Sequence, residues 1–231
     1  MIILALDALD KNMVDRFNCK NLMQLEYGKT NISEFKLPRT IVLWSSFLTG
    51  KNMEKKIPIK GQWKFNLKVS ETFFSFFNSY KAIDVPGFSF KQKPHEKERK
   101  LLKGFFNDEN TIEDYDEVVW KIHEKNKLEF LNSLEDLDII MGYFNLADAI
   151  GHLSFGNEKK MRDIYEELES ITRKVKKNEN FILVISDHGM KAVGRFGDHT
   201  NNGFYSTNKK LNLKEPKITD FYEIIKVRSH A

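Results

Sequence analysis

Short apolar runs alternate along the chain with segments in which apolar and polar residues follow a helical spacing. Ile2–Leu6, Leu137–Phe144 and Phe181–Ser186 are almost entirely apolar, which is typical of strands buried on both faces of a parallel sheet. Lys81–Val85 has a similar character and ends at a Pro-Gly step, so a further buried strand is expected there. Phe181–Ser186 is expected at the centre of the sheet, and a last strand is expected near Phe204.

The intervening segments predict helices. The expected helices cover Asp10–Phe17, Ile41–Leu48 with Gly50 as its C-cap, about Lys159–Lys176, and a stretch that starts at Asp220. Residues 89–127 are charged and helical in pattern, without a strand. Strands that alternate with helices indicate an α/β fold with a mainly parallel central sheet. We expect one domain over residues 1–231, in which a segment of about 60–138 supplies part of the core and a small, reduced cap.

Composition narrows the class of protein only slightly. The 231 residues include 37 basic and 33 acidic side chains, for a net charge of +4, and this weak bias does not predict a stable complex with nucleic acid. Cys19 is the single cysteine, so no internal disulfide is possible. The apolar start ends within a few residues at an acid, and no apolar run is long enough to span a membrane. We therefore expect a cytoplasmic protein without a membrane partner.

Six Asp and His residues follow the carboxyl ends of the expected strands, where ligands bind in open α/β sheets. They are Asp7, Asp148, His152, Asp187, His188 and His199. Taken singly, each has an ordinary explanation: an Asp can cap a turn or helix, Asp148 and His152 can pair within a helix, and His199, in the loop 197–200, can lie on the surface. Asp187 and His188 are harder to explain in this way, because two adjacent polar groups at a buried strand end are costly unless something pairs them.

Taken together, the six residues predict a metal centre. Their mixed nitrogen and oxygen donors suit zinc or manganese, and six ligands are too many for one tetrahedral zinc site, which points to two metals. The remaining histidines, His95, His123 and His230, lie in charged or terminal segments and are expected to be solvated.

Four blocks of this sequence resemble the type I phosphodiesterase/nucleotide pyrophosphatase branch of the alkaline-phosphatase superfamily. The blocks are Ile3–Asp7, Pro38–Gly50 with its Trp-x-Ser-Phe-x-Thr-Gly segment, Asp148–His152, and Val184–Met190 followed by His199. They occur in the family's order and cover nearly the whole chain, apart from a middle segment that is shorter than usual. The resemblance implies an alkaline-phosphatase-like three-layer sandwich with a mainly parallel central sheet and a small cap insertion.

The resemblance also implies roles for individual residues. Asp7, Asp187, His188 and the Thr40 hydroxyl would surround one metal, and Asp148, His152 and His199 would bind the other. Thr40 falls at the family's nucleophile position when counted back from Thr49 and Gly50, whereas the alternatives Ser45, Ser46 and Thr49 would lie inside the helix. Two divalent cations are expected, zinc first, with manganese or iron as alternatives. The implied reaction is hydrolysis of a small phosphoester, a phosphodiester, through a phosphothreonine intermediate.

Departures from the family pattern leave other functions open. The amide that holds the phosphate in the family has no clear counterpart: Gly61 and Trp63 lie near its expected place, and Asn66, Lys51 or backbone N–H groups could substitute for it. A phosphomonoesterase or phosphonate hydrolase could use the same residues, as could a metal-binding protein that has lost turnover. A sulfatase does not fit, because Cys19 lacks the sequence context of the sulfatase nucleophile. The aromatic residues of 63–77 belong either to the core or to a substrate pocket.

Overall fold

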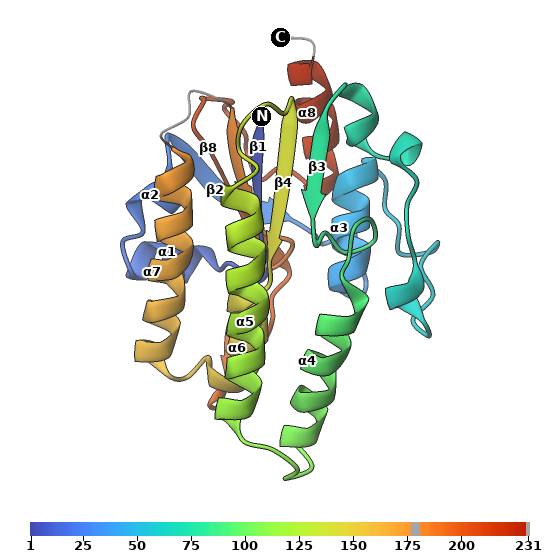
Figure 1. The fold of residues 1–231 in the computed structure, drawn as a ribbon. Helices are drawn as coiled ribbons and strands as arrows, with labels where there is room; N and C mark the ends of the chain where they lie inside the picture. The colour runs from blue at the N-terminus through green and yellow to red at the C-terminus, as the bar shows by residue number, and fades with distance from the viewer. Residues whose placement is uncertain (177–180, 230–231) are drawn as a thin grey trace.

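The computed structural model describes residues 1–176 and 181–229, and its centre is a six-stranded sheet in the order β2-β8-β5-β1-β4-β3 (Figure 1). The strands of this sheet are β1 (Ile2–Leu6), β2 (Glu26–Asn31), β3 (Tyr80–Ile83), β4 (Ile139–Phe144), β5 (Ile182–Ile185) and β8 (Asn202–Thr207). The β3, β4, β1 and β5 strands are parallel to one another. Only β8 runs against its neighbours β5 and β2. The predicted mainly parallel α/β sheet is therefore confirmed.

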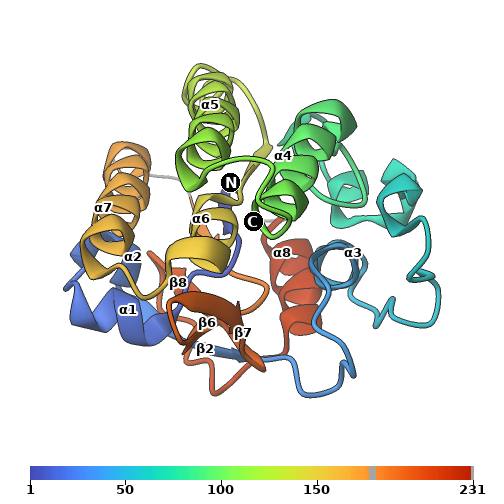
Figure 2. The same cartoon turned by 90° about the horizontal axis from the view of Figure 1, so that it is seen from below.

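Helices cover both faces of this sheet. They are α1 (Lys11–Arg16), α2 (Lys20–Met23), α3 (Thr40–Thr49), α4 (Gln92–Phe105), α5 (Ile112–Leu131), α6 (Leu146–Ser154), α7 (Glu158–Val175) and α8 (Phe221–Ser229). Short 3-10 turns are η1 (Gln62–Lys64), η2 (Val69–Glu71), η3 (Phe73–Phe76) and η4 (Ile218–Asp220). Figure 2 shows α1, α2, α5, α6 and α7 on one side of the sheet and α3 and α8 on the other.

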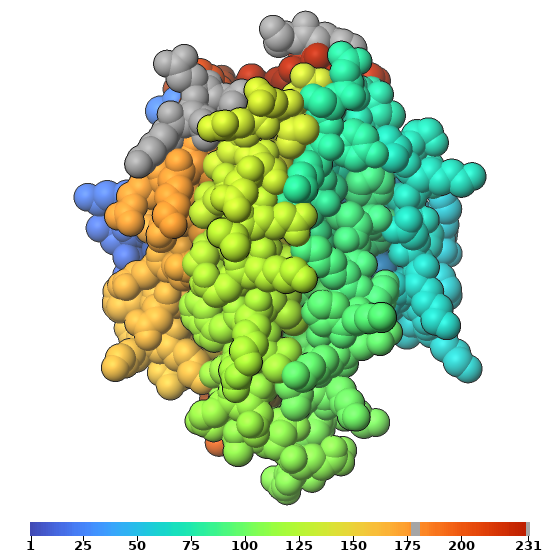
Figure 3. All heavy atoms as spheres, in the orientation of Figure 1, coloured from blue at the N-terminus to red at the C-terminus, as the bar shows by residue number. Residues whose placement is uncertain are grey.

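The alternation of side chains along β1 separates the two hydrophobic cores. Ile2, Leu4 and Leu6 are buried against α1, α2, α5, α6 and α7, whereas Ile3 and Ala5 are buried against α3, α8 and η3. Successive residues of a strand point to opposite faces, so a strand that is apolar throughout must be covered on both sides. The result is the predicted three-layer sandwich. Seen from the side of Figure 1, α7, α5 and α4 form a continuous surface over the sheet (Figure 3).

Three sequence expectations for the strands are wrong. β3 pairs only with β4 and is an edge strand, not a buried one, and Tyr80 is 38% exposed. β2 was not predicted, because its Glu, Lys and Asn residues lack the apolar signal of a central strand. A hairpin of β6 (Met190–Val193) and β7 (Phe196–His199) was also missed, so His199 lies on a strand and not in a loop.

The middle segment divides between the core and the rim of the sheet. Within it, α5 packs on β4 and β3 joins the sheet, while η1 and α4 lie beside the sheet end where the acids gather. Phe73 and Phe74 are fully buried in the core, whereas Trp63 lies in the wall of a pocket. We propose that the cap expected within about 60–138 consists of η1, its flanking loops and α4. No helix in the described ranges is long and apolar enough to cross a membrane.

Candidate metal centre and active site

The first group of the predicted site lies at the buried ends of two neighbouring strands. Asp7 follows β1, and Asp187 and His188 follow β5; all three side chains are fully buried. One ligand atom from each lies within 4.8 Å of the others. His188 Nε2 is 3.4 Å from Asp7 Oδ1 and 3.4 Å from Asp187 Oδ2. The pairing of β1 with β5 brings together residues that are far apart in the sequence.

A second group lies beside the first and is more open to solvent. Asp148 and His152 face the same way because they are four residues apart on α6, and His199 approaches them from β7. Asp148 Oδ1 is 3.3 Å from Nε2 of His152 and 3.3 Å from Nε2 of His199. The rings of His188 and His199 stack with centroids 3.7 Å apart. His188 therefore lies between the groups, and one of its ring nitrogens also falls within 4.8 Å of ligand atoms of Asp148 and His199.

Each of the three histidines has a backbone carbonyl beside its Nδ1 atom. His188 Nδ1 faces Gly189 O at 3.1 Å, His199 Nδ1 faces Pro38 O at 3.2 Å, and His152 Nδ1 faces Gly197 O at 3.4 Å. A carbonyl accepts only, so Nδ1 carries a proton, and in the neutral ring Nε2 presents its lone pair to the cluster. Such an arrangement is typical of histidines that bind metals.

Several buried atoms of the cluster have no hydrogen-bond partner in the described chain. They are Asp7 Oδ1, Asp148 Oδ1, Asp187 Oδ2 and His188 Nε2. In addition, the Nε2 atoms of His152 and His199 face each other at 3.3 Å, which requires a proton or a cation between two lone pairs. Unpaired buried polar atoms are costly, and here they converge from two sides. The residues present therefore fit two divalent cations.

Without cations, burial and the charges of neighbouring residues shift the pKa values of the cluster side chains. Burial, reinforced by the charges of Asp187 and Asp148, raises the pKa of Asp7 well above its usual value. Burial also raises the pKa of Asp187 to about 7 and lowers the pKa of His188. Asp148 behaves oppositely: burial would raise its pKa, but His152 and His199 together lower it well below the usual value. The charge of Asp148 in turn raises the pKa of His152 to about 9. Bound protons thus neutralise negative charge in the cluster that metal ions could neutralise instead.

Thr40 is the first residue of α3 and lines the same pocket as Asp148, His152 and His199. The residue before it, Arg39, has extended backbone angles and makes no side-chain cap. The Thr40 hydroxyl is half-buried and forms no hydrogen bond within residues 1–176 and 181–229. The backbone N–H groups that open a helix have no partner within it. An acceptor such as a phosphate oxygen could therefore bind at this point.

The alternative nucleophiles lie away from the pocket. Ser46 Oγ donates to Val42 O at 2.7 Å, and Thr49 Oγ1 donates to Ser45 O at 2.8 Å, so both hydroxyls are used inside α3. Ser45 is fully buried beneath Gly87. Of the four hydroxyl residues weighed from the sequence, only Thr40 lines the pocket. Asp7, Asp187 and His188 do not line the pocket, and no hydrogen bond joins Thr40 to them in the described chain.

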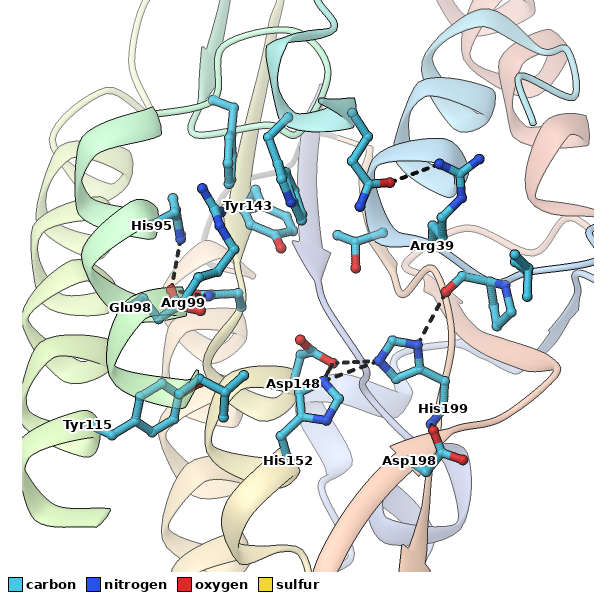
Figure 4. Close-up of a pocket in the computed structure, with 18 of the residues that line it drawn as sticks. Arg39, His95, Glu98, Arg99, Tyr115, Tyr143, Asp148, His152, Asp198 and His199 are labelled. Carbon is cyan, nitrogen blue, oxygen red and sulfur yellow. Dashed lines mark hydrogen bonds and ion pairs between the residues drawn. The ribbon is translucent and has the colours of Figure 1, made fainter. Parts of the chain in front are cut away.

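Figure 4 shows the pocket, which has a volume of about 570 Å³. Asp148, His152 and His199 lie at one end; Arg39 lies on the side of α3, and His95, Glu98 and Arg99 lie on α4. Gln62 accepts a 2.9 Å hydrogen bond from Arg39 Nη1. The family's phosphate-holding amide is expected near Gly61 and Trp63. Of the amide side chains that line the pocket, Gln62 is the closest to that place in the sequence. Asn66 and Lys51 do not line the pocket.

Tyr143 is a residue of the site that the sequence did not reveal. Its fully buried hydroxyl donates a hydrogen bond to Asp7 Oδ2, and burial, followed by the charge of Asp7, raises the pKa of this phenol well above its usual value. Tyr143 lies within the otherwise apolar sequence of β4, so nothing in the sequence marks its hydroxyl as part of a site. It leaves Asp7 Oδ1 as the oxygen that faces the cluster.

Two histidines expected to be solvated are buried. His95 is 2% exposed and bridges two carboxylates: Nε2 is 2.9 Å from Asp84 Oδ2 and Nδ1 is 2.8 Å from Glu98 Oε2. His123 is 1% exposed, and its Nε2 is 3.0 Å from Glu167 Oε1. The expectation failed because packing encloses both rings and pairs them with carboxylates: Asp84 after β3 and Glu98 of the same helix for His95, and Glu167 of α7 for His123 on α5. His230 lies outside the described residues.

Comparisons with known proteins support the fold. No family model matches the sequence, and no curated protein matches it. Among solved structures, murine ectonucleotide pyrophosphatase/phosphodiesterase 5 matches with a TM-score of 0.50 and 13% identity over 84% of this chain. PsFucS1 sulfatase from Pseudoalteromonas sp. matches with a TM-score of 0.48 and 12% identity over 99% of this chain and 66% of its own.

The chain covers 58% of the length of the mouse protein. At 13% identity, what the two proteins share is the fold. The class that the comparison defines is thus the alkaline-phosphatase-like α/β fold, as the sequence resemblance implied.

Proposed function

We propose that this chain is a metal-dependent phosphoester hydrolase, a phosphodiesterase, in which Thr40 is the nucleophile. The observation that carries the proposal is the convergence of four buried atoms that lack a hydrogen-bond partner in the described chain, on Asp7, Asp148, Asp187 and His188, in a cluster beside the Thr40 pocket. Purely structural carboxylates would be paired with donors. The fold shared with a phosphodiesterase supports the same class of reaction.

The two groups of side chains would hold two cations. Asp7, Asp187 and His188 would hold one, with Thr40 completing its ligands, and Asp148, His152 and His199 would hold the other. The mixture of carboxylate oxygens and imidazole nitrogens favours zinc, with manganese or iron as alternatives. When bound, such ions lower the pKa of a hydroxyl nucleophile and neutralise charge on the transferred phosphoryl group.

The chain's own groups position the substrate. The N-terminus of α3 lies at the pocket, where Thr40 lines the wall, and favours an anion through the helix dipole. Arg39, held by Gln62 and by Ile57 O at 2.9 Å, supplies a nearby positive charge. Thr40 Oγ1 displaces the leaving oxygen at phosphorus, and water then displaces Thr40 Oγ1. The intermediate is a phosphothreonine, and the products are an alcohol and a phosphomonoester.

Hydrolysis of two nitrophenyl substrates by matched variants tests this proposal. Wild type, Thr40→Ser and Thr40→Ala are supplied with zinc or manganese and given bis(4-nitrophenyl) phosphate or 4-nitrophenyl phosphate. We expect faster cleavage of the diester, partial activity in Thr40→Ser and a loss of about 1,000-fold or more in Thr40→Ala. Equal rates for wild type and Thr40→Ala would refute Thr40 as nucleophile. Faster cleavage of the monoester would instead assign a phosphomonoesterase.

A further inference from the structure

The pocket wall formed by α4 and η1 is a stack of four side chains. The guanidinium carbon of Arg99 lies 4.7 Å from the ring centroid of Trp63. Trp63 stacks on Phe90 with centroids 5.2 Å apart and ring planes 21° apart, and Phe90 stacks on His95 at 4.3 Å and 12°. Gln92 of α4 donates a hydrogen bond to Trp63 O, which ties the two segments together. The stack holds Arg99 at a fixed place in the pocket wall.

Arg99 forms no direct ion pair or hydrogen bond in the described part of the chain, although the charges of Glu98 and Glu96 lie near enough to act on it. The adjacent carboxylate, Glu98, accepts through its Oε2 atom from His95 at 2.8 Å and from Asn145 at 2.9 Å. Arg99 is half-buried and forms neither an ion pair nor a hydrogen bond there, and burial lowers the pKa of its guanidinium. Arg39, across the pocket, is held by neutral oxygens of Gln62 and Ile57. Two guanidinium groups thus line one pocket without a carboxylate partner.

We propose that Arg99 binds a second oxyanion of the substrate, a carboxylate or phosphate on the part of the molecule away from the reacting phosphorus. This inference rests on the proposed function for the position of that phosphorus. The natural substrates are then small phosphoesters that carry two anionic groups. Arg99 is a specificity-determining residue in this arrangement.

The chemistry of the guanidinium group explains the choice of ligand. The guanidinium carbon of Arg99 lies over the ring of Trp63, while its N–H groups have no acceptor among the described residues. An arginine edge binds carboxylate or phosphate with two parallel hydrogen bonds. Because the group is fixed by stacking and partly removed from water, little side-chain freedom is lost on binding, and the attraction is stronger than at an open surface.

Binding of inert phosphonates tests the inference without turnover. Calorimetry on the zinc-supplied protein compares alkylphosphonates with ω-carboxyalkylphosphonates and alkanediphosphonates over a series of chain lengths. At the best chain length we expect wild type to bind the doubly anionic ligands about 10- to 100-fold more tightly, the range for charge-assisted hydrogen bonds. Arg99→Gln should remove this preference, and Arg99→Lys should keep a part of it. Lys100→Gln, which removes the same charge from an exposed neighbour on α4, should retain it fully.

The two doubly anionic series also show which anionic group Arg99 prefers. Tighter binding of the ω-carboxyalkylphosphonates identifies a carboxylate, and tighter binding of the alkanediphosphonates identifies a phosphate. Equal affinity of wild type for singly and doubly anionic ligands, absence of binding, or an undiminished preference in Arg99→Gln would overturn the inference. A preference that depends on Arg99, in a protein that cleaves no phosphoester, would leave the inference standing and reject the proposed hydrolase.

Discussion

The buried His95 bridge predicts a pH-dependent part of the protein's stability. Both ring nitrogens of His95 contact carboxylates, those of Asp84 and Glu98. Burial would lower the pKa of this imidazole, but the two carboxylates outweigh it and raise the pKa from 6.5 to about 9. The perturbation is His95→Gln, which keeps a polar side chain that can contact the same groups but removes the charge.

The size of the effect follows from the two pKa values. The difference between 6.5 in the unfolded chain and about 9 in the folded protein corresponds to about 3 kcal/mol. Because the folded-state pKa is the higher one, this stabilisation is fully present below about pH 6.5 and is lost as the pH rises through about 9. The free energy of unfolding of His95→Gln should therefore fall below that of wild type by about 3 kcal/mol more at pH 6 than at pH 10.

Urea unfolding of both proteins at a series of pH values measures this difference. A chelator in every sample keeps metal binding from adding its own pH dependence. Other titrating groups are shared by the two proteins and largely cancel in the comparison. A destabilisation that stays the same between pH 6 and 10 would refute the reasoning, because it would mean that folding does not shift the pKa of His95.

Three further predictions concern the metal cluster and the sheet. Zinc should raise the melting temperature and a chelator should reverse the rise, because ions contact the cluster atoms that lack a hydrogen bond. At a free zinc concentration of about 100 times the dissociation constant, the folded protein gains about 2.7 kcal/mol per site. An unchanged melting curve would argue against the site. Tyr143→Phe removes the donor to Asp7 and should weaken metal affinity by about 10- to 100-fold, measured by competition with a chromogenic chelator; unchanged affinity would show that Tyr143 does not orient Asp7. Gly142→Ala places a Cβ 2.5 Å from the ring of Phe130 and should lower the free energy of unfolding by about 1–3 kcal/mol without changing metal affinity; wild-type stability in urea would show that the β4–α5 contact yields easily.

The parallel part of the fold, and the gathering of most candidate site residues at one end of the sheet, could be predicted because they obey one rule. A strand buried on both faces must be apolar throughout, as Ile2–Leu6 is, so the polar residue that follows it marks the functional end of the sheet. Asp7 and Asp187 carry that signal. The structure brings them and their neighbours together in two overlapping groups.

The remaining features left weak or misleading signals. β2 and the β6–β7 hairpin are polar and largely exposed or half-buried, so apolar patterning does not distinguish them from loops. His95 looked solvated because charged residues surround it. Two signals could have identified it: Asp84 follows a strand as Asp7 does, and Glu98 lies three residues away on one helix. His188 belongs to both groups because of the path of the loops after the strands. The spacing of residues in the sequence does not determine that path.

The most direct test of the central claim is the metal content of the protein. The purified chain is incubated with zinc, freed of excess metal and measured by elemental analysis, beside Asp7→Ala and Asp148→Ala variants, each of which affects one ligand group. The account predicts about two ions in wild type and about one in each variant. Wild type without bound metal, after zinc, manganese and iron have each been supplied, would contradict it.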